Sequence, residues 1–411
     1  MGRVTVSVRR SQLGASRVSP SDLAIVAALI FAWGALSAKL QRFDVTAPIT
    51  FVIAGVVLTH GPLAPLGFAP APGTVKTLAE FTLVLVLFSD ASRVGLRDLR
   101  HDMGLCLRLL VVGLPLTIGL GTLLAFALLP GISGWLALVA GAALAPTDAA
   151  LGANMMTNPA VPARIRRLIN VESGLNDGIA TPFVLIAVAG AGTAEHAAGP
   201  TPGLALAELL LGVLIGAAVL ALAACAYASA LALHGNGFIS AFVGGLAFGA
   251  IGGRRSEGLM PFVEETGGLV SLLVWLAFGA VAVVPALESL SWQTGLYAVL
   301  SLTLIRMLPV SVALAGSGLD RVAVAFVGWF GPRGLASVVF ALIALEDLGS
   351  SDAGPAVAVI TVTVLLSVLV HGATADPLAR RYGPRLALAA GGPDEAGLPS
   401  LPERRIIRRT S

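Results

Sequence analysis

The sequence predicts an all-α membrane protein, on the evidence of its composition and its long apolar stretches. Of the 411 residues, 56% are hydrophobic and only 12% are charged, which is about half the charged fraction of a soluble domain. Backbone groups in lipid must be satisfied internally and the stretches do not alternate as barrel strands do, so each is expected to be a helix. Twelve apolar windows approach the length needed to cross the membrane, beginning near Leu23, Ala47, Thr77, Leu105, Trp135, Val171, Gly203, Gly237, Gly267, Leu296, Val322 and Ala356.

The stretch 203–235 decides whether the chain crosses twelve or thirteen times, because it is long for one crossing and short for two. Basic loops after the first, third and fifth windows belong in the cytoplasm by the positive-inside rule, which puts the N-terminus outside. Two short or tilted helices in this stretch would also place the later basic clusters in the cytoplasm. Thirteen crossings are therefore favoured, and the arginines of the N-terminal tail are the exception.

Three regions are expected: an N-terminal tail (1–22), a membrane domain (23–375) and a short cytoplasmic C-terminal tail (376–411). The N-terminal tail has no apolar core of its own, so no cleavable signal peptide is predicted. The basic C-terminal residues favour contact with lipid head groups. A net charge of +3 without a basic stripe excludes nucleic-acid binding, and the scattered histidines predict no metal cofactor.

The strongest cluster of polar residues opens the sixth window. Glu172 and Asn176 are i,i+4 neighbours, as are Ser173 and Asp177, so one helix face carries four polar groups. Their oxygens are hard ligands suited to Na⁺ or K⁺. Burial favours the neutral form of a carboxylic acid, so a proton and a cation would compete for Asp177. The alternative is an ordinary helix N-terminus with acidic residues.

A second cluster, Pro146-Thr147-Asp148, lies inside the fifth window. Pro146 removes a backbone donor and frees carbonyls within the membrane, which is tolerated where they line protein or a cavity. Broken helices of this kind bind ions in secondary transporters. Thr147 would supply oxygens to the cation, and Asp148 would neutralise helix-end dipoles. The alternative is a simple kink with a capping aspartate.

A third cluster is basic and predicts a second unwound helix, because Gly331, Pro332 and Gly334 surround Arg333. With thirteen crossings, the two broken helices are separated by an odd number of crossings, as an inverted repeat requires.

Arg306 lies about ten residues into an apolar run and cannot deprotonate. We expect it to pair with Glu172, which leaves Asp177 as the titrating acid.

Three blocks resemble the monovalent cation/proton antiporter family, in its sodium/proton exchanger branch. They are residues 145–149 (APTDA), 172–178 (ESGLNDG) and 328–334 (GWFGPRG). The resemblance implies thirteen helices with inverted repeats and two discontinuous crossed helices. It also implies a homodimer of the inner membrane that exchanges ions in pH homeostasis.

The resemblance also implies roles for single residues. Asp177 would bind the cation and the proton, Thr147 and Ser173 would help to coordinate Na⁺, and Asn176 and Asp148 would support the site. Asn176 before Asp177, where a related branch has two aspartates, implies electroneutral exchange.

Some alternatives remain open. The stretch 203–235 is shorter than the family pattern by roughly one helix, so an inactive or truncated antiporter is one alternative, and a K⁺/H⁺ antiporter is another. An ion channel is disfavoured by the lack of a filter sequence. An intramembrane enzyme is disfavoured by the lack of a nucleophile with its base.

Overall fold

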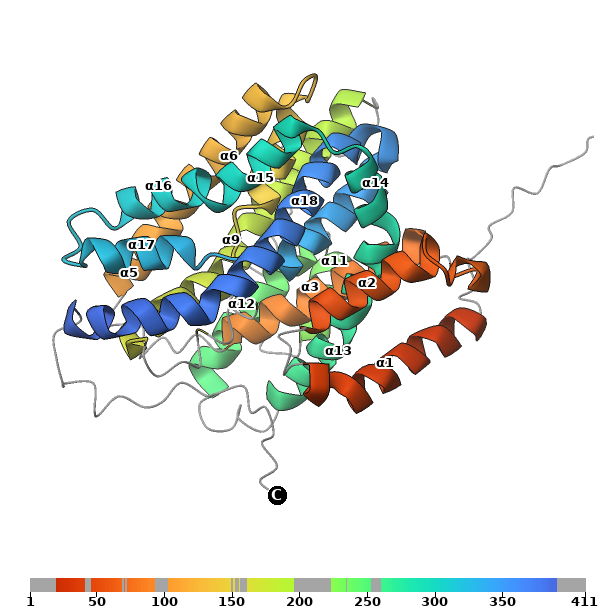
Figure 1. The fold of residues 1–411 in the computed structure, drawn as a ribbon, viewed down its shortest axis with the longest axis horizontal. Helices are drawn as coiled ribbons and strands as arrows, with labels where there is room; N and C mark the ends of the chain where they lie inside the picture. Colours follow the sequence, from red (N-terminus) through yellow and green to blue (C-terminus); the bar gives the residue numbers. More distant parts are fainter. Residues whose placement is uncertain are drawn as a thin grey trace, which may run out of the picture.

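The structure, a computed structural model, describes residues 20–40, 46–68, 70, 72–92, 103–148, 151, 155, 161–195, 223–233, 235–252 and 260–389, and this part is almost entirely helical (Figure 1). The N-terminal half contains α1 (Pro20–Leu40), α2 (Ala47–Thr59), η2 (Ala64–Leu66), α3 (Pro72–Ser92), α5 (Met103–Arg108), η3 (Leu109–Gly113), α6 (Leu114–Leu128), α7 (Gly134–Ala143) and α9 (Ala163–Glu195). The C-terminal half contains α11 (Ala223–Ala232), α12 (Gly237–Gly252), α13 (Met260–Phe278), η6 (Gly279–Val283), α14 (Val284–Glu288), α15 (Trp292–Leu302), α16 (Leu304–Ala313), α17 (Arg321–Trp329) and α18 (Leu335–Ala389).

The predicted apolar windows coincide with described helices, apart from the window that begins at Gly203, of which only the part with α11 lies within the described residues. Within the described part, five helical stretches are long and apolar enough to cross a membrane: Met103–Leu128, Ala163–Gly192, Val263–Glu288, Trp292–Ala313 and Leu335–Gly383. The all-α membrane fold is therefore confirmed. The number of thirteen crossings stays a prediction, because most of the stretch 203–235 lies outside the described residues.

The two predicted tails are described only in part. The first helix begins at Pro20, and residues 1–19 lie outside the described part. α18 continues as a helix to Ala389, so the first part of the segment 376–411 is helical.

Two membrane helices contain π-helical segments that the sequence analysis did not predict. One is Leu109–Gly113, between α5 and α6, and the other is Gly279–Val283, between α13 and α14. Each segment is followed closely by a proline, Pro115 or Pro285. A proline ring clashes with the carbonyl four residues earlier, and here that carbonyl lies inside the π-helical segment. The wider turn therefore accommodates the proline without ending the helix.

Small residues let α2 approach the helix formed by α13 and η6. A Cβ atom added at Gly55 would lie 2.2 Å from the carbonyl oxygen of Leu276. A Cβ added at Gly279 would lie equally close, 2.2 Å, to the carbonyl oxygen of Val52. The contact is therefore backbone to backbone, as in other membrane helix pairs built on small residues.

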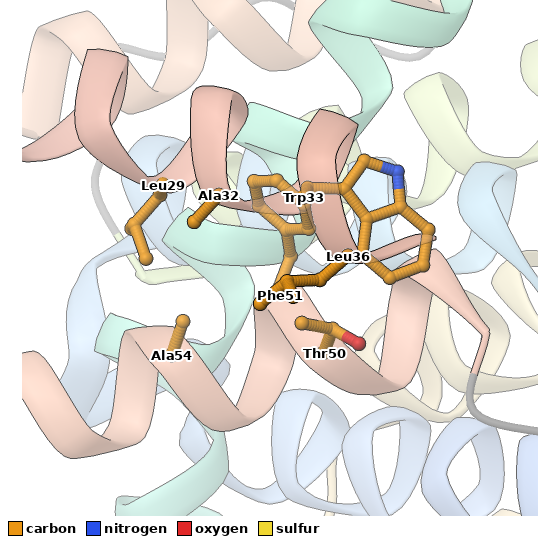
Figure 2. A pocket seen from close by; sticks show the side chains of 7 residues that line it. All are labelled: Leu29, Ala32, Trp33, Leu36, Thr50, Phe51 and Ala54. Atoms are coloured by element: carbon orange, nitrogen blue, oxygen red, sulfur yellow. The ribbon is translucent and has the colours of Figure 1, made fainter. Parts of the chain in front are cut away.

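α1 packs beside α2 at the edge of the bundle (Figure 1). Trp33 of α1 meets Phe51 of α2 edge to face, with ring centroids 6.2 Å apart. The pocket between these helices is lined by Leu29, Ala32, Trp33, Leu36, Thr50, Phe51 and Ala54 (Figure 2). None of the predicted site residues lines this apolar pocket.

The two interruptions that the sequence predicts are present, and they touch each other. α7 ends at Ala143, before Pro146, and α17 ends at Trp329, so that the chain is non-helical until α18 begins at Leu335. The backbone N–H of Asp148 donates a hydrogen bond to the carbonyl of Pro332, 2.8 Å away. The fold thus brings two unwound segments from distant parts of the sequence into direct contact.

Candidate ion-binding site

The polar face of α9 is buried in the protein. Glu172 is 2% exposed, Ser173 5%, Asn176 0% and Asp177 7%. α9 is helical from Ala163 to Glu195, so the i,i+4 spacing seen in the sequence places these four side chains on one face. Because buried polar groups are costly unless they are paired or functional, the partners of each one are informative.

Two of these side chains contact the unwound segment after α7 through Thr147. The Ser173 hydroxyl donates to the backbone carbonyl of Thr147. The Asn176 amide donates to the Thr147 hydroxyl oxygen, with 2.8 Å between the nitrogen and the oxygen. The structure therefore brings together three of the predicted site residues. Their remaining oxygens lie at the boundary between α9 and the broken helix.

One carboxylate oxygen of Asp177 has no hydrogen-bond partner among the described residues. The Asp177 Oδ1 atom is buried and accepts no hydrogen bond from any described residue, and the same holds for Asn176 Oδ1. The backbone carbonyl of Asp177, by contrast, accepts a hydrogen bond from the Thr181 hydroxyl at 2.7 Å. Two buried oxygens on adjacent residues are thus left without a donor, as expected where a proton or a cation binds.

Asp148 caps the second half of the other broken helix. Its Oδ2 atom accepts a hydrogen bond of 3.1 Å from the backbone N–H of Leu335, the first residue of α18. A carboxylate at this position satisfies an otherwise unpaired N–H and interacts favourably with the helix dipole. Gly334 makes the contact possible, since a Cβ atom there would lie 2.1 Å from the same carboxylate oxygen.

Arg333 is fully buried and binds three backbone carbonyls. Its Nη1 atom donates to the carbonyls of Ala145 at 2.6 Å and Pro146 at 3.2 Å, just beyond the end of α7. Its Nη2 atom donates to the carbonyl of Ser301, in the last turn of α15, at 3.2 Å. The positive charge thus lies where two helix C-terminal ends present their negative dipole ends. From the sequence, Arg333 is predicted only to lie in an unwound segment.

Arg306 lies against Glu172 in a two-pronged ion pair. Arg306 Nη1 is 2.6 Å from Glu172 Oε1, and Nη2 is 2.7 Å from Oε2. Both side chains are 2% exposed. Gly331 provides the room for this pair, because a Cβ atom at that position would lie 2.5 Å from Arg306 Nε. Of the predicted site carboxylates, Glu172 is therefore neutralised by an arginine.

The helix that carries Arg306 is itself interrupted, and the sequence analysis did not predict this. α15 ends at Leu302, Thr303 has φ −112° and ψ −90°, and α16 begins at Leu304. The break leaves the Ser301 carbonyl available to Arg333. A signal in the sequence is Pro309, six residues later, which removes a donor but does not locate the break.

Comparisons with known proteins agree with this geometry. The transmembrane family of sodium/hydrogen exchangers matches residues 25–222 and 216–381, two ranges that overlap inside the stretch 203–235. Uncharacterised Na⁺/H⁺ exchangers of Mycobacterium bovis and Mycobacterium tuberculosis are 26% identical to this chain, over 92% of it and 80% of the relative.

Solved structures show the same fold. A structure of the sodium proton antiporter MjNhaP1 from Methanocaldococcus jannaschii at pH 8 superposes with a TM-score of 0.69 at 16% identity, covering 88% of this chain and 98% of the antiporter. An electron-microscopy map of the same antiporter gives a TM-score of 0.61 at 16% identity, covering 87% and 97%. The chain is a multi-pass membrane protein that belongs to the sodium/hydrogen exchanger family and has the fold of a sodium/proton antiporter.

Proposed function

We propose that this protein exchanges Na⁺ for H⁺ across the cytoplasmic membrane, and that the two ions compete for Asp177. The observation that carries the proposal is the buried Asp177 oxygen without a donor, beside the contact of Asn176 with Thr147. The names of the relatives, Na⁺/H⁺ exchangers and a sodium proton antiporter, support the same reaction.

Charge explains why the exchange would be obligatory. A deprotonated Asp177 would be a buried negative charge, which is costly without a counter-charge. The buried guanidinium of Arg306 is already engaged by Glu172. Asp177 is therefore stable either as the neutral acid or as a carboxylate with a bound cation, and each state excludes the other. Because one positive charge replaces another, we expect electroneutral exchange.

The ligands of the dehydrated cation would be oxygens from α9 and from the unwound segment after α7. Asp177 and Ser173 contribute from α9, and Thr147 contributes from the unwound segment after α7. Carboxylate, hydroxyl and amide oxygens suit a hard monovalent ion, but they do not by themselves select its size. Na⁺ is the proposed substrate because the relatives are named for it, and K⁺ is a competitor within the same test.

The proposal is tested in proteoliposomes that contain a pH dye, to which Na⁺, K⁺ or Li⁺ is added in turn. We expect Na⁺ to alkalinise the lumen with the wild-type protein and not with Asp177→Asn, which keeps the shape and removes the titrating charge. Asp320→Asn is the matched control, because Asp320 is an exposed cap of α17. An imposed membrane potential should leave the rate unchanged. Retained exchange in Asp177→Asn, or a folded wild-type protein without exchange, would contradict the proposal.

A further inference from the structure

His371 is a buried titratable side chain that the proposed exchange does not use. It lies in the second half of α18, after the turn at Gly349 where φ is 80°, and it is 1% exposed. Its Nε2 atom is 2.9 Å from the carbonyl oxygen of Trp329. Its Nδ1 atom is 3.1 Å from the hydroxyl oxygen of Ser367, one helical turn earlier. Both ring nitrogens therefore have partners.

The neighbours of the imidazole favour one of its two neutral forms. The Trp329 carbonyl is the partner of Nε2 and can only accept, so this contact is a hydrogen bond only when Nε2 carries the proton. Nδ1 is close both to the Ser367 hydroxyl and, at 3.0 Å, to the Ser367 carbonyl, and the hydroxyl can donate to an unprotonated Nδ1. The neutral form with its proton on Nε2 therefore makes a hydrogen bond at each nitrogen, with the Ser367 hydroxyl as the donor to Nδ1.

The Ser367 hydroxyl extends the chain of hydrogen bonds to the other end of the break. It accepts a hydrogen bond of 2.7 Å from the backbone N–H of Arg333. The chain thus runs in one direction, from the Arg333 N–H through Ser367 and His371 to the Trp329 carbonyl. Trp329 is the last residue of α17, and Arg333 lies two residues before α18. One side-chain pair therefore binds backbone groups on both sides of the unwound segment, and the Trp329 carbonyl accepts a second hydrogen bond, of 2.8 Å, from the Gly331 N–H.

The Trp329 side chain reinforces this connection. Its ring lies against the His371 imidazole, with centroids 5.4 Å apart and an angle of 36° between the planes. Its indole N–H donates to the Thr374 hydroxyl at 3.2 Å. α18 thus holds the end of α17 by backbone and side chain together. We call the group Trp329, Arg333, Ser367 and His371 the clasp.

The clasp fixes the position of Arg333, which in turn holds the chain next to the ion site. The Arg333 backbone is held by Ser367, and its guanidinium holds the carbonyls of Ala145 and Pro146. Thr147 is the next residue. A shift of Arg333 would therefore be transmitted directly to the segment that contacts Ser173 and Asn176.

We propose that neutral His371, acting through Ser367, is a positioning residue for ion exchange, because it clasps the two ends of the unwound segment between α17 and α18. A doubly protonated imidazole cannot keep the direction of this chain, because Nδ1 would donate to the Ser367 hydroxyl or carbonyl oxygen. Both of its nitrogens would be donors, so the Ser367 hydroxyl would lose its acceptor. It would also add a positive charge to a core that already contains Arg333 and Arg306. This inference rests on the proposed function, so its test has one measurement that is independent of transport.

The first measurement is hydrogen–deuterium exchange of the purified protein, followed at the amide of Arg333. The variants are His371→Leu, Ser367→Ala and His371→Gln, whose uncharged amide retains a donor and an acceptor. Thr363→Val is the matched control, because the Thr363 hydroxyl is buried on the same helix and, among the described residues, bonds only the Val359 carbonyl in its own helix. We expect the amide to exchange at least about five-fold faster in His371→Leu and Ser367→Ala. It should be unchanged in the other two variants.

The second measurement is cation-driven exchange in proteoliposomes. We expect His371→Leu to lower the maximal rate by at least about ten-fold, because small misplacements of a site have large effects on its rate. His371→Gln should recover most of the activity. The double variant His371→Leu with Ser367→Ala should be no worse than the more impaired single variant, since both break one chain.

Each outcome decides a different claim. An unchanged Arg333 amide in His371→Leu would show that the clasp does not hold the break. A faster amide with full transport would show that the clasp does not position the site. Equal impairment of His371→Leu and His371→Gln would point to ring shape and overturn the hydrogen-bond account. A wild-type protein without exchange would overturn the proposed function, and the amide measurement would still decide whether the clasp exists.

Discussion

Asp148 and Arg333 each bind the broken end of the other's helix. The Asp148 carboxylate caps the first N–H of α18, which follows Arg333 in the chain, and the Arg333 guanidinium binds the carbonyls just after α7, which precede Asp148. Each charge has the sign that stabilises the helix end it touches, because N-terminal ends are positive and C-terminal ends are negative. The two unwound segments can therefore cross in the membrane without leaving these backbone groups unpaired.

Replacing Arg333 by lysine should disrupt the contact between the two unwound segments although the positive charge is kept. A lysine ammonium is a point charge and cannot reproduce the planar fork that contacts three carbonyls. We expect a loss of at least about 3 kcal/mol of stability, seen as a lower melting temperature in detergent, together with loss of exchange. Arg380→Lys is the control, because Arg380 is exposed and pairs only with Asp376 among the described contacts. A melting temperature of Arg333→Lys equal to that of the wild type would contradict the capping role.

Gly334→Ala should displace the Asp148 carboxylate. The added methyl group would lie 2.1 Å from Oδ2, well inside contact distance. Overpacking of this kind costs about 1–3 kcal/mol, and here it also separates Asp148 from the N–H of Leu335. The matched change Gly354→Ala, within α18, meets no atom within 4 Å. In thermal melts and exchange assays, Gly334→Ala should be less stable and less active than Gly354→Ala. Identical behaviour of the two variants would exclude a role for the contact between Asp148 and Leu335.

Glu172→Gln should destabilise the protein more than it impairs exchange. The substitution leaves the buried Arg306 guanidinium without its counter-charge, and breaking a buried pair on one side costs about 3–5 kcal/mol. We expect the double variant Glu172→Gln with Arg306→Met to regain much of the lost stability. The measurement is the melting temperature of the wild type, of Glu172→Gln and of the double variant. An unaltered melting temperature for Glu172→Gln alone would count against a structural ion pair.

Thr147→Val tests the contact between the unwound segment and α9. It removes the hydroxyl that accepts from Asn176 and so leaves a buried amide N–H unpaired, at a cost of about 1–3 kcal/mol. We expect a higher half-saturating Na⁺ concentration, while Thr147→Ser should behave as the wild type. If valine at this position leaves Na⁺ dependence unaltered, Thr147 is not a ligand.

The sequence predicts the membrane fold well because its signals are strong and local. Apolar windows of spanning length define helices wherever they occur. Pro146 and Pro332 locate two interruptions, because proline removes a donor within a helix. The prolines that follow the π-helical segments carried similar information, but a proline alone does not distinguish a break from a wider turn. The break at Thr303 has no such local signal.

The sequence is less informative about partners that are distant in the chain. Glu172 could be assigned to Arg306 because a buried arginine requires a carboxylate. The role of Arg333 could not, since its partners are backbone carbonyls at Ala145, Pro146 and Ser301, which any sequence would supply. The clasp was missed for a related reason, because two of its four partners are a backbone carbonyl and a backbone N–H.

The central claim is that a cation displaces a proton from Asp177, and the most direct test is proton release on cation binding. Purified wild-type protein in weakly buffered detergent solution, with a pH indicator, is mixed with Na⁺, K⁺ or Li⁺ at a series of starting pH values. We expect up to about one proton released per chain with the transported ion, none at high pH where Asp177 is already deprotonated, and none from Asp177→Asn at any pH. Release from Asp177→Asn equal to that of the wild type would contradict the account and place the exchanging proton elsewhere.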